Sequence, residues 1–313
     1  MKPLVILNPQ AEGGRAGKHA ADIRRVVESY LGPLEMAPTE GPRHAVTIAR
    51  EAAEAHRDLV VVVGGDGTVH EVVNGIMAAS VAPDARPTLG LVGQGTGGDF
   101  RKSLGLVHRL DQYCLAMARR RTRRVDIGRM TYRDRDGEAT SGHFINILSA
   151  GMGGLVDEYV ATSHKRFGGK AAYLSASVKA LMNNEVGALK VTLDPDTDDV
   201  RELAVDTRLI AVCNGRFFGG GMEVAPMAEP DDGWFDVVSL GSAPKLQFAL
   251  STLSIYRGRH VDNPDVLVQR ARQIRVELGD ASTRFPLDVD GEPLGSLPLD
   301  IEVVPGALSF CVP

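Results

Sequence analysis

The chain has 313 residues, of which 43% are hydrophobic and 24% are charged, and this composition suits one large or two medium globular domains. Its net charge of −5 provides no general basic field, which argues against nucleic acid as a partner. Apolar runs such as Leu59 to Val63 fall far short of the roughly 20 residues that span a bilayer. No signal peptide is visible at the start, and the three cysteines lack metal-binding spacing, so we expect a cytoplasmic protein with buried thiols.

The chain opens with a predicted strand, Leu4 to Leu7, which ends at Asn8-Pro9. A loop containing Gly13-Gly14 follows, and apolar spacing then predicts a helix that ends near Tyr30. The loop lacks the GxxxxGK[ST] spacing of a P-loop. Asn8 therefore has two interpretations, as a residue that fixes a strand-to-helix turn or as one that contacts a nucleotide.

The next strand is predicted at Leu34 to Ala37, and a helix is predicted from about Arg43 to His56. Thr39 lies between them, as a turn or capping residue or as part of a ligand site. A buried strand then follows at Leu59 to Val63, and it leads into Gly64-Gly65-Asp66-Gly67-Thr68 and a helix.

The loop around Asp66 gives the strongest functional signal of the chain. Its glycines would let the backbone adopt positive φ and approach a ligand closely, and the amides at the start of the following helix favour phosphate. Asp66 would repel a bare phosphate, so it is better suited to a metal ion or a substrate hydroxyl. We interpret the loop as a nucleotide-phosphate site, with a structural turn as the alternative.

A fourth predicted strand, Thr88 to Val92, leads into a loop that carries Thr96 and Asp99. Strands that alternate with helices predict a mostly parallel sheet with helices on both faces. Loops at the carboxyl ends of such strands bind ligands, so the glycine loops are expected to share one site. After a helix at Leu110 to Ala118, the basic run Arg119 to Arg124 is either a solvated helix end or a patch for anionic lipids. A strand at Val125 to Gly128 then carries Asp126.

The chain beyond residue 130 is rich in short strands separated by turns, which predicts a sandwich of antiparallel sheets. Two helices interrupt it, at about Lys170 to Met182 and Lys245 to Arg257, and the last segment is expected to return to the first domain. The predicted strands are Phe144 to Leu148, Leu189 to Leu193, Thr207 to Cys213, Phe235 to Leu240, Gln273 to Leu278 and Pro286 to Val289.

Three turns of this second region contain residues that could take part in binding or catalysis. Asn214 to Met222 is a glycine-dense bend, and Glu229 to Trp234 is either a plain turn or a cation site built from carbonyl and carboxylate oxygens. Asp288 to Glu292 is either a solvated turn or, if it faces a phosphate, the source of a general base.

Together these stretches resemble the catalytic-domain family of the diacylglycerol kinases, which includes bacterial soluble lipid kinases and sphingosine kinases. The GGDGT stretch also occurs in NAD kinases, but the ordered set of motifs is far more specific. The matching motifs are Asn8-Pro9 with Gly13-Gly14, Gly64 to Gly75, Gly95 to Phe100, Val125 to Gly128, Asn214-Gly215 with Gly219 to Gly221, Asp232-Gly233 and Asp290 to Glu292.

The resemblance implies an α/β fold with two domains and an active site in the cleft between them. Residues 1–128, with a returning segment at about 303–313, would form an ATP-binding domain like that of NAD kinases and diacylglycerol kinases. Residues 129–302 would form a β-sandwich-like domain for the lipid substrate. The nucleotide residues implied are Asn8, Thr39, Gly65, Asp66, Gly67, Thr68, Val69, His70, Glu71 and Thr96.

The resemblance also implies roles for the acidic residues. Asp66, Asp99 and Asp126 match carboxylates that organise Mg²⁺ and water around the phosphates, and Glu292 matches the proposed proton acceptor, with Asp66 as the other assignment. A cation site in the second domain maps to Asp232 and the main-chain oxygens of Glu229 and Trp234.

The expected function is therefore transfer of the γ-phosphate of ATP to a lipid hydroxyl. The alternatives are a kinase of a soluble substrate, like NAD kinase, and a catalytically silent sensor of nucleotide or lipid. A lipid substrate requires peripheral contact with a membrane, expected at the inner surface, for which the arginine run and exposed apolar residues near Phe217 and Phe218 are candidates. The sequence is also compatible with a homodimer.

Overall fold

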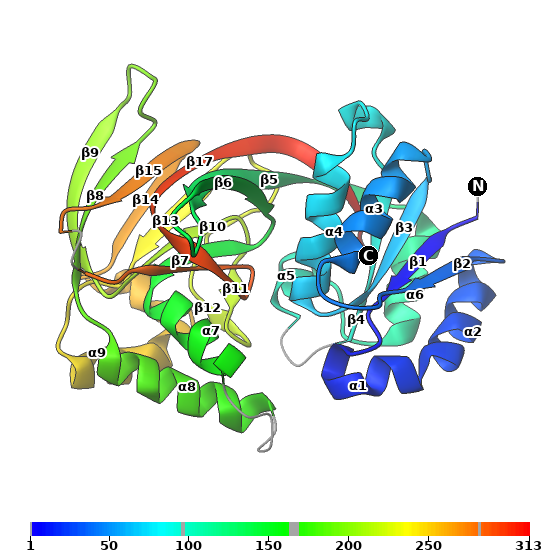
Figure 1. The fold of residues 1–313 in the computed structure, drawn as a ribbon, viewed down its shortest axis with the longest axis horizontal. Coiled ribbons are helices and arrows are strands. Elements are labelled where there is room, and N and C mark those ends of the chain that lie inside the picture. The colour runs from blue at the N-terminus through cyan, green and yellow to red at the C-terminus, as the bar shows by residue number, and fades with distance from the viewer. Residues whose placement is uncertain (1, 95–97, 163–168, 281–282) are drawn as a thin grey trace. The chain divides into compact units, whose positions relative to one another are not determined.

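A computed structural model describes residues 2–94, 98–162, 169–280 and 283–313 of the chain. The chain divides into two compact units (Figure 1). The first comprises Met1–Ile127 together with Val304–Pro313, and the second comprises Gly128–Val303.

The first unit is built on a parallel sheet with the strand order β4-β3-β1-β2. Almost every residue of β1, β3 and β4 is buried, as expected for a sheet covered on both faces. The end of β17 (Glu292–Cys311) adds a parallel partner beside β4, where Phe310 pairs with Leu89. The four central strands are β1 (Leu4–Leu7), β2 (Glu35–Pro38), β3 (Leu59–Gly64) and β4 (Thr88–Gly93).

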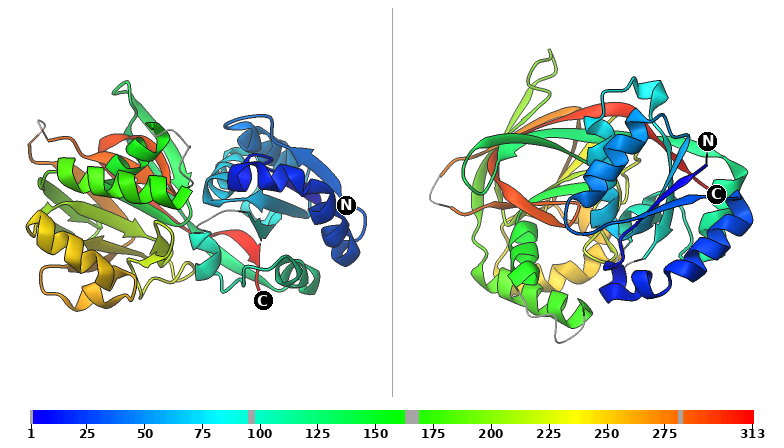
Figure 2. Two further views of the ribbon diagram at one scale, coloured as in Figure 1. Left: turned by 90° about the horizontal axis from the view of Figure 1, so that it is seen from below. Right: turned by 45° about the vertical axis from the view of Figure 1, so that its right-hand side comes forward.

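Helices cover both faces of this sheet (Figures 1 and 2). Helix α3 packs against α4, and α2 packs against α6. In α2 the buried Ile23 and Val27 lie one turn apart, so its inward face follows the apolar spacing of the sequence. The helices are α1 (Ala11–Lys18), α2 (Ala20–Leu31), α3 (His44–Glu54), α4 (Asp66–Ala78), α5 (Asp99–Ser103) and α6 (Leu110–Arg119), with the short 3-10 helix η1 (Pro83–Ala85).

The second unit is a β-sandwich-like array of antiparallel strands that share the long strand β17. One run has the order β14-β13-β10-β7-β16-β17, and β17 also pairs with β15 and β5, which lead on to β8, β9 and β6. The strands are β5 (Thr122–Arg133), β6 (Ala139–Phe144), β7 (Ile147–Gly151), β8 (Gly187–Leu193), β9 (Arg201–Thr207), β10 (Leu209–Cys213), β13 (Phe235–Ser239), β14 (Leu267–Ala271), β15 (Gln273–Leu278) and β16 (Pro286–Val289).

One apolar core collects side chains from both runs of strands. Phe144 of β6 and Phe235 of β13 lie with their ring centroids 5.2 Å apart, and both are fully buried. Among the described residues, the unit also contains the helices α7 (Met152–Thr162), α8 (Gly169–Asn183) and α9 (Lys245–Ile255) and the 3-10 helix η3 (Arg259–Asp262). Within the described residues, no helix is both long enough and apolar enough to cross a bilayer.

Several features of the second unit differ from the sequence prediction. Strands β9 and β14 were not expected, and the predicted strand Thr207 to Cys213 is divided between β9 and β10. The run Phe144 to Leu148 is not one strand, because the N–H groups of Ile145 and Asn146 bond to the Asp290 carboxylate and β6 and β7 separate there. Helix α7 is missing from the sequence prediction because two residues of its first turn, Gly153 and Gly154, have a low helix propensity. These glycines serve its packing, since a Cβ at Gly154 would lie 2.4 Å from the carbonyl oxygen of Pro286 in β16.

The close packing of α3 on α4 gives a test of the first unit. A Cβ on Gly75 would lie 2.3 Å from the main-chain oxygen of Val46 and 2.9 Å from Cβ of Ala49. Because a backbone oxygen cannot rotate away, Gly75→Ala should destabilise the protein by about 1–3 kcal/mol, measured by urea unfolding. Gly41→Ala is the matched control, since a Cβ there meets no atom within 4 Å. Equal stability of the two variants would contradict the observed helix spacing.

Candidate active site

The nucleotide residues predicted in the first unit gather at one edge of the parallel sheet. The predicted residues Asn8, Thr39 and Gly65 directly follow β1, β2 and β3, and Gln94, which was not among the predicted residues, follows β4. The carboxyl ends of parallel strands share one edge. The Asn8 amide donates to Thr68 Oγ1 at 3.0 Å across 60 positions of sequence. Main-chain bonds hold the neighbouring loops, from Thr39 N to the Leu7 oxygen and from Gln94 N to the Gly64 oxygen, both at 2.8 Å.

The glycines of the β3–α4 turn act differently from the prediction. The expectation of positive φ is wrong for Gly64, Gly65 and Gly67, because α4 already begins at Asp66 and the turn is very short. Gly64 is required for another reason, since a Cβ there would lie 2.4 Å from Thr68 Oγ1. The close approach that this glycine permits is to the protein's own threonine.

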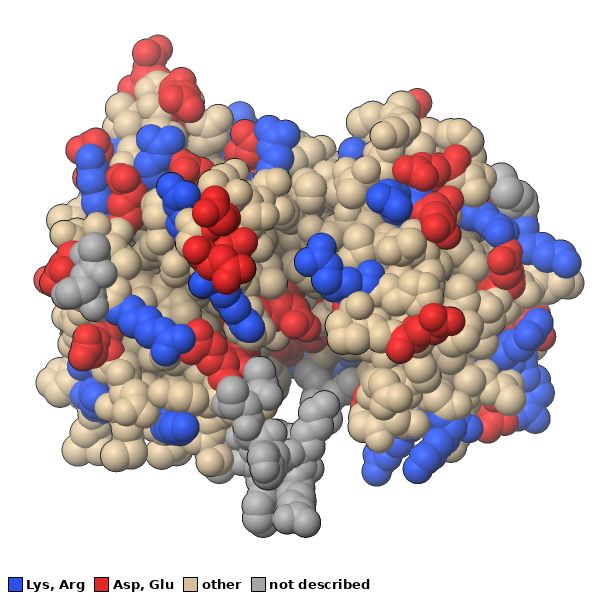
Figure 3. Space-filling view, viewed as in Figure 1, with Lys and Arg blue, Asp and Glu red and all other residues tan. Residues whose placement is uncertain are grey.

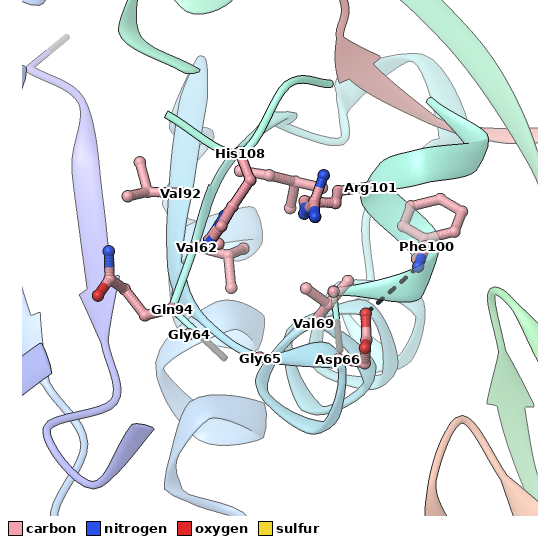
Figure 4. Close-up of a pocket in the computed structure, with 13 residues that line it drawn as sticks. Val62, Gly64, Gly65, Asp66, Val69, Val92, Gln94, Phe100, Arg101 and His108 are labelled. Carbon is pink, nitrogen blue, oxygen red and sulfur yellow. Dashed lines mark hydrogen bonds between the residues drawn. The ribbon is translucent and has the colours of Figure 1, made fainter. Parts of the chain in front are cut away.

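Asp66 and Asp99 are brought together by a helix cap. The Asp66 carboxylate accepts the N–H of Asp99 at 3.0 Å and that of Phe100 at 3.4 Å, as Figure 4 shows for Phe100. Asp99 is 4% exposed and forms an ion pair with Lys102 at 2.7 Å. Thr96, which belongs to the same loop, lies outside the described residues.

A pocket lies behind this cap, between β3, β4 and α5, and it is lined by Val62, Val69, Leu91, Phe100 and the glycines of both loops. Its cavity volume of about 20 Å³ has room for roughly one water molecule. An ATP molecule therefore cannot lie inside it. Val69 is 6% exposed, so its side chain forms part of the wall.

The next residues of α4 have partners within the protein. His70 bonds to Asn74 through both its ring and its main-chain oxygen, at 3.3 and 2.9 Å. Glu71 accepts the N–H of Arg43 at 2.9 Å and of Ala45 at 3.2 Å, so its carboxylate, and not Thr39, caps α3. Direct nucleotide contact by these side chains stays a prediction.

Asp126 is anchored to the returning C-terminal strand. The residue is 1% exposed, and its Oδ1 accepts the N–H of Gly306 at 2.6 Å. The nearby arginine run has a related role, because Arg124 donates to the Gly306 oxygen at 2.8 Å and Arg121 to the Pro313 oxygen at 3.2 Å. The bonds of Asp126 and Arg124 join β5 to β17, and the bond of Arg121 joins the residues just outside these strands. A role of Asp126 toward Mg²⁺ stays a prediction.

In the second unit, a tight turn presents Glu292 as the exposed first residue of β17. Val289 pairs with Glu292, and Asp290 and Gly291 between them have φ of 54° and 90°, as in the two-residue turns that match the twist of a hairpin. The Asp290 carboxylate accepts three main-chain N–H groups from residues 145–147 at 2.9–3.2 Å. Asp288 Oδ1 accepts the N–H of Gly291 at 2.8 Å.

The loop after β10 bonds to the same segment. The Asn214 amide donates to the Ile145 oxygen at 2.6 Å, and the Asn146 amide donates to the Phe217 oxygen at 2.9 Å. The loop then forms a small hairpin of β11 (Phe217–Phe218) and β12 (Met222–Glu223). The sequence predicts exposed side chains for Phe217 and Phe218, and this prediction is wrong. Both are half-buried because they belong to this packed hairpin.

Sequence reasoning missed an acidic pair beside this turn. The Asp157 carboxyl of α7 hydrogen-bonds to the Asp288 carboxylate, and burial, followed by the charge of Asp288, raises the pKa of Asp157 to about 10. Burial also raises the pKa of Asp288, while Ser149 Oγ donates to it at 3.3 Å. The pair therefore shares a proton at neutral pH. Asp157 carried no signal in the sequence because its helix was not predicted.

In the predicted cation site, the one side-chain ligand, Asp232, is already paired within the protein. Asp232 Oδ1 accepts the N–H of Trp234 at 3.0 Å, and Asp232 Oδ2 pairs with the guanidinium of Arg270. Burial raises the pKa of neighbouring Asp236 to about 6, against the opposing charge of Arg270. Among the described residues, no three acidic, histidine or cysteine side chains gather around a common point.

Comparison with known proteins places this geometry in a family. Residues 2–130 match the diacylglycerol kinase catalytic domain, and residues 146–312 match the YegS C-terminal NAD kinase beta sandwich-like domain. The chain belongs to the diacylglycerol kinase catalytic-domain family. The fold class is accordingly mixed α/β, with a β-sandwich-like C-terminal domain.

Family relatives align over most of their length. A diacylglycerol kinase of Bacillus subtilis is 28% identical over 94% of this chain and 90% of its own. A YegS-like probable lipid kinase of Chromohalobacter salexigens is 30% identical over 86% and 80%. A crystal structure of a candidate diacylglycerol kinase from Bacillus anthracis superposes with a TM-score of 0.79 at 25% identity, covering 100% of this chain and 95% of that one.

The shared proton of this diacylglycerol kinase family member predicts a pH-dependent stability. The pKa of Asp157 rises from 3.8 to about 10 on folding, so between these values the folded state binds more protons than the unfolded state. The raised pKa therefore makes its full contribution to the stability of the folded state below a pH of about 4. This contribution falls as the pH rises toward 10. The side chain introduced by the substitution Asp157→Asn cannot ionise. The Tm of this variant, relative to the Tm of the wild type, should therefore increase as the pH rises.

Thermal unfolding from mildly acidic to mildly alkaline pH measures this difference. A full proton corresponds to about 1.4 kcal/mol per pH unit, which is an upper limit for the slope. Asp198→Asn is the control, because Asp198 is exposed in the turn between β8 and β9. A Tm difference that does not change with pH would show that Asp157 and Asp288 do not share a proton.

Proposed function

We propose that this chain is an ATP-dependent lipid kinase, which transfers the γ-phosphate of ATP to a lipid hydroxyl. Its membership of a kinase family supports phosphotransferase activity, and the named relatives are diacylglycerol and lipid kinases. The observation that carries the proposal is the edge of the parallel sheet, where the Asn8–Thr68 bond and the Asp66 cap hold three loops together.

In this proposal, residues 1–128 with about 303–313 bind ATP across the carboxyl ends of the strands. The main-chain amides at the start of α4 and the residues Asn8, Thr39 and Thr96 would contact the nucleotide, together with Gly65 to Glu71. The small volume of the pocket behind the loops supports a position over the loops rather than behind them. Positioned amides and a helix N-terminus offset phosphate charge.

Asp66 and Asp99 fit a Mg²⁺ ion that arrives with ATP, because Mg²⁺ commonly takes one or two carboxylates together with substrate phosphates. When bound, the ion would neutralise charge that develops on the phosphates. The two groups that bond to Asp66 are neutral main-chain amides, and a carboxylate has about four lone-pair sites. Asp126 is proposed to support the same phosphates more distantly.

Residues 129–302 are proposed to recognise the lipid and to supply the base. A lipid hydroxyl oxygen forms a bond to the γ-phosphorus in line with the leaving group, and the bond from that phosphorus to the β–γ bridging oxygen breaks. ADP leaves, and the hydroxyl proton passes to the Glu292 carboxylate. The proposed role of Glu292 depends on its turn, which the Asp290 carboxylate fixes through three N–H groups.

A substrate panel tests this function and its two main alternatives. Radiolabelled ATP is supplied with diacylglycerol, a sphingoid base, a total lipid extract and NAD, and the products are identified. A labelled lipid supports the proposal, and phosphorylated NAD would favour a soluble-substrate kinase. Nucleotide binding without any turnover would favour a sensor.

Two variants separate the roles within the active enzyme. Glu292→Ala removes the proposed proton acceptor and should lower kcat by about 10²–10⁴-fold, while the Kd for ATP in equilibrium binding stays near the wild-type value. Asp66→Asn keeps an acceptor for the α5 amides but loses charge, so it should raise the Mg²⁺ concentration required for half-maximal rate. Wild-type turnover of the Glu292 variant would exclude this residue as the base.

A lipid substrate also implies contact with a membrane, and α8 and α9 present the best surface for it. Met182 of α8 is 69% exposed, and Leu246 and Leu253 of α9 are 76% and 70% exposed. Leu246 and Leu253 lie seven positions apart and hence on one face of the helix. The two helices are in contact, and Lys245 Nζ bonds to the Met182 oxygen. Figure 3 shows few acidic side chains at the lower left, where Figure 1 places α8 and α9.

The double variant Leu246→Asp, Leu253→Asp should bind anionic vesicles more weakly and phosphorylate vesicle-embedded lipid more slowly, because charged side chains resist entry into the apolar interface. Activity on the same lipid in detergent micelles should change little. The control pair Glu202→Ala, Asp206→Ala changes exposed residues of β9. Equal vesicle binding by the two double variants would exclude this face.

A further inference from the structure

An arginine and two aspartates form an ion cluster at the edge of the C-terminal sheet. Asp236 of β13 and Arg270 of β14 are direct partners in the antiparallel register. The Arg270 guanidinium pairs with Asp232, and its Nε lies 3.6 Å from Asp236 Oδ1. Because cross-strand partners lie on the same face of a sheet, the backbone itself places the guanidinium beside both carboxylates.

The indole of Trp234 packs against two arginines of this region. Arg270 lies over the ring at 5.6 Å from its centroid, and Arg272 lies over it at 4.4 Å. The main-chain N–H of Trp234 also donates to Asp232 Oδ1, which closes a small turn. Arg270 thus contacts the aspartate, the indole and the opposite strand, and it is oriented from three sides.

Asp232 and Trp234 of this cluster, together with Glu229, are the residues at which the family resemblance implied a divalent cation. A hard cation needs carboxylate oxygens without a competing positive charge, but Asp232 Oδ2 already pairs with the Arg270 guanidinium, which would also repel a divalent ion. The Asp236 side chain is 3% exposed, and a carboxylate at such a depth requires a positive partner. The guanidinium supplies that charge.

We propose that Arg270 is a built-in counter-ion that takes the place of a divalent cation in the C-terminal unit. Its positive charge holds the Asp232 turn and the β13–β14 edge together at any cation concentration. This proposal concerns stability and cation binding, so it does not depend on the kinase function.

The first test compares cation responses without nucleotide. The wild type and Asp232→Asn are unfolded thermally in EDTA and in millimolar CaCl₂ or MgCl₂. The two proteins should show the same Tm change on adding cation, because the wild-type site is already occupied by Arg270. A saturable rise of the wild-type Tm that Asp232→Asn abolishes would overturn the proposal.

The second test removes the charge and keeps the packing. Arg270→Met retains an aliphatic stem over Trp234 but leaves Asp232 and Asp236 without a counter-charge, so its Tm in EDTA should fall by about 5 °C. CaCl₂ should then restore at least half of the loss, because the two carboxylates become available as ligands. The double variant Arg270→Met, Asp232→Asn should show no such recovery.

Arg272→Met is the matched control, since it removes the other cation above the same ring and leaves the pairing of Arg270 intact. Its Tm should not respond to CaCl₂. An Arg270→Met protein with the wild-type Tm would overturn the proposal. A lowered Tm that no cation restores would also overturn it, by showing that Arg270 serves packing rather than charge.

Discussion

Carboxylates that accept main-chain N–H groups from distant segments hold the motifs of this protein in place. Asp66 receives two N–H groups from the start of α5, Glu71 receives two from the start of α3, and Asp290 receives three from the β6–β7 junction. Bonds of this kind to an ionised acceptor are about twice as strong as neutral ones. Each one also fixes the position of a loop that would otherwise depend on its own weak turn preferences.

These bonds distinguish acidic residues that anchor the backbone from those to which the proposed function gives a chemical role. Asp290 and Glu71 accept main-chain N–H groups with both of their carboxylate oxygens, which holds these side chains in place. Glu292 differs because it is exposed and opens a strand whose start is fixed by its neighbours. Asp66 lies between these cases, since its two amide bonds orient a carboxylate at the sheet edge. In the Asp290 to Glu292 turn, for example, Asp290 anchors the backbone and thereby fixes the position of Glu292.

The sequence predicted the elements whose apolar runs are uninterrupted, and it failed where a long-range bond decides the structure. Strands such as β3 and β15 were located well because burial alone defines them. The break between β6 and β7 depends on Asp290, which lies far along the chain, and helix α7 was hidden by glycines that its packing requires. Motif residues Asn8 and Thr68 were both predicted, but their mutual bond depends on tertiary structure. Asp157 carried no pattern at all.

The second unit contains two acidic pairs, and their different counter-charges have different consequences. Asp157 and Asp288 lie too close for both to ionise, so a proton neutralises one of them. Asp232 and Asp236 share an arginine, whose charge does not titrate in the physiological range. The first pair therefore links the stability of the Glu292 turn to pH. In the second pair the arginine supplies a constant positive charge, and Asp236, whose pKa is raised to about 6, is the group that titrates. The same electrostatic constraint is thus met by a proton in one pair and by a guanidinium in the other.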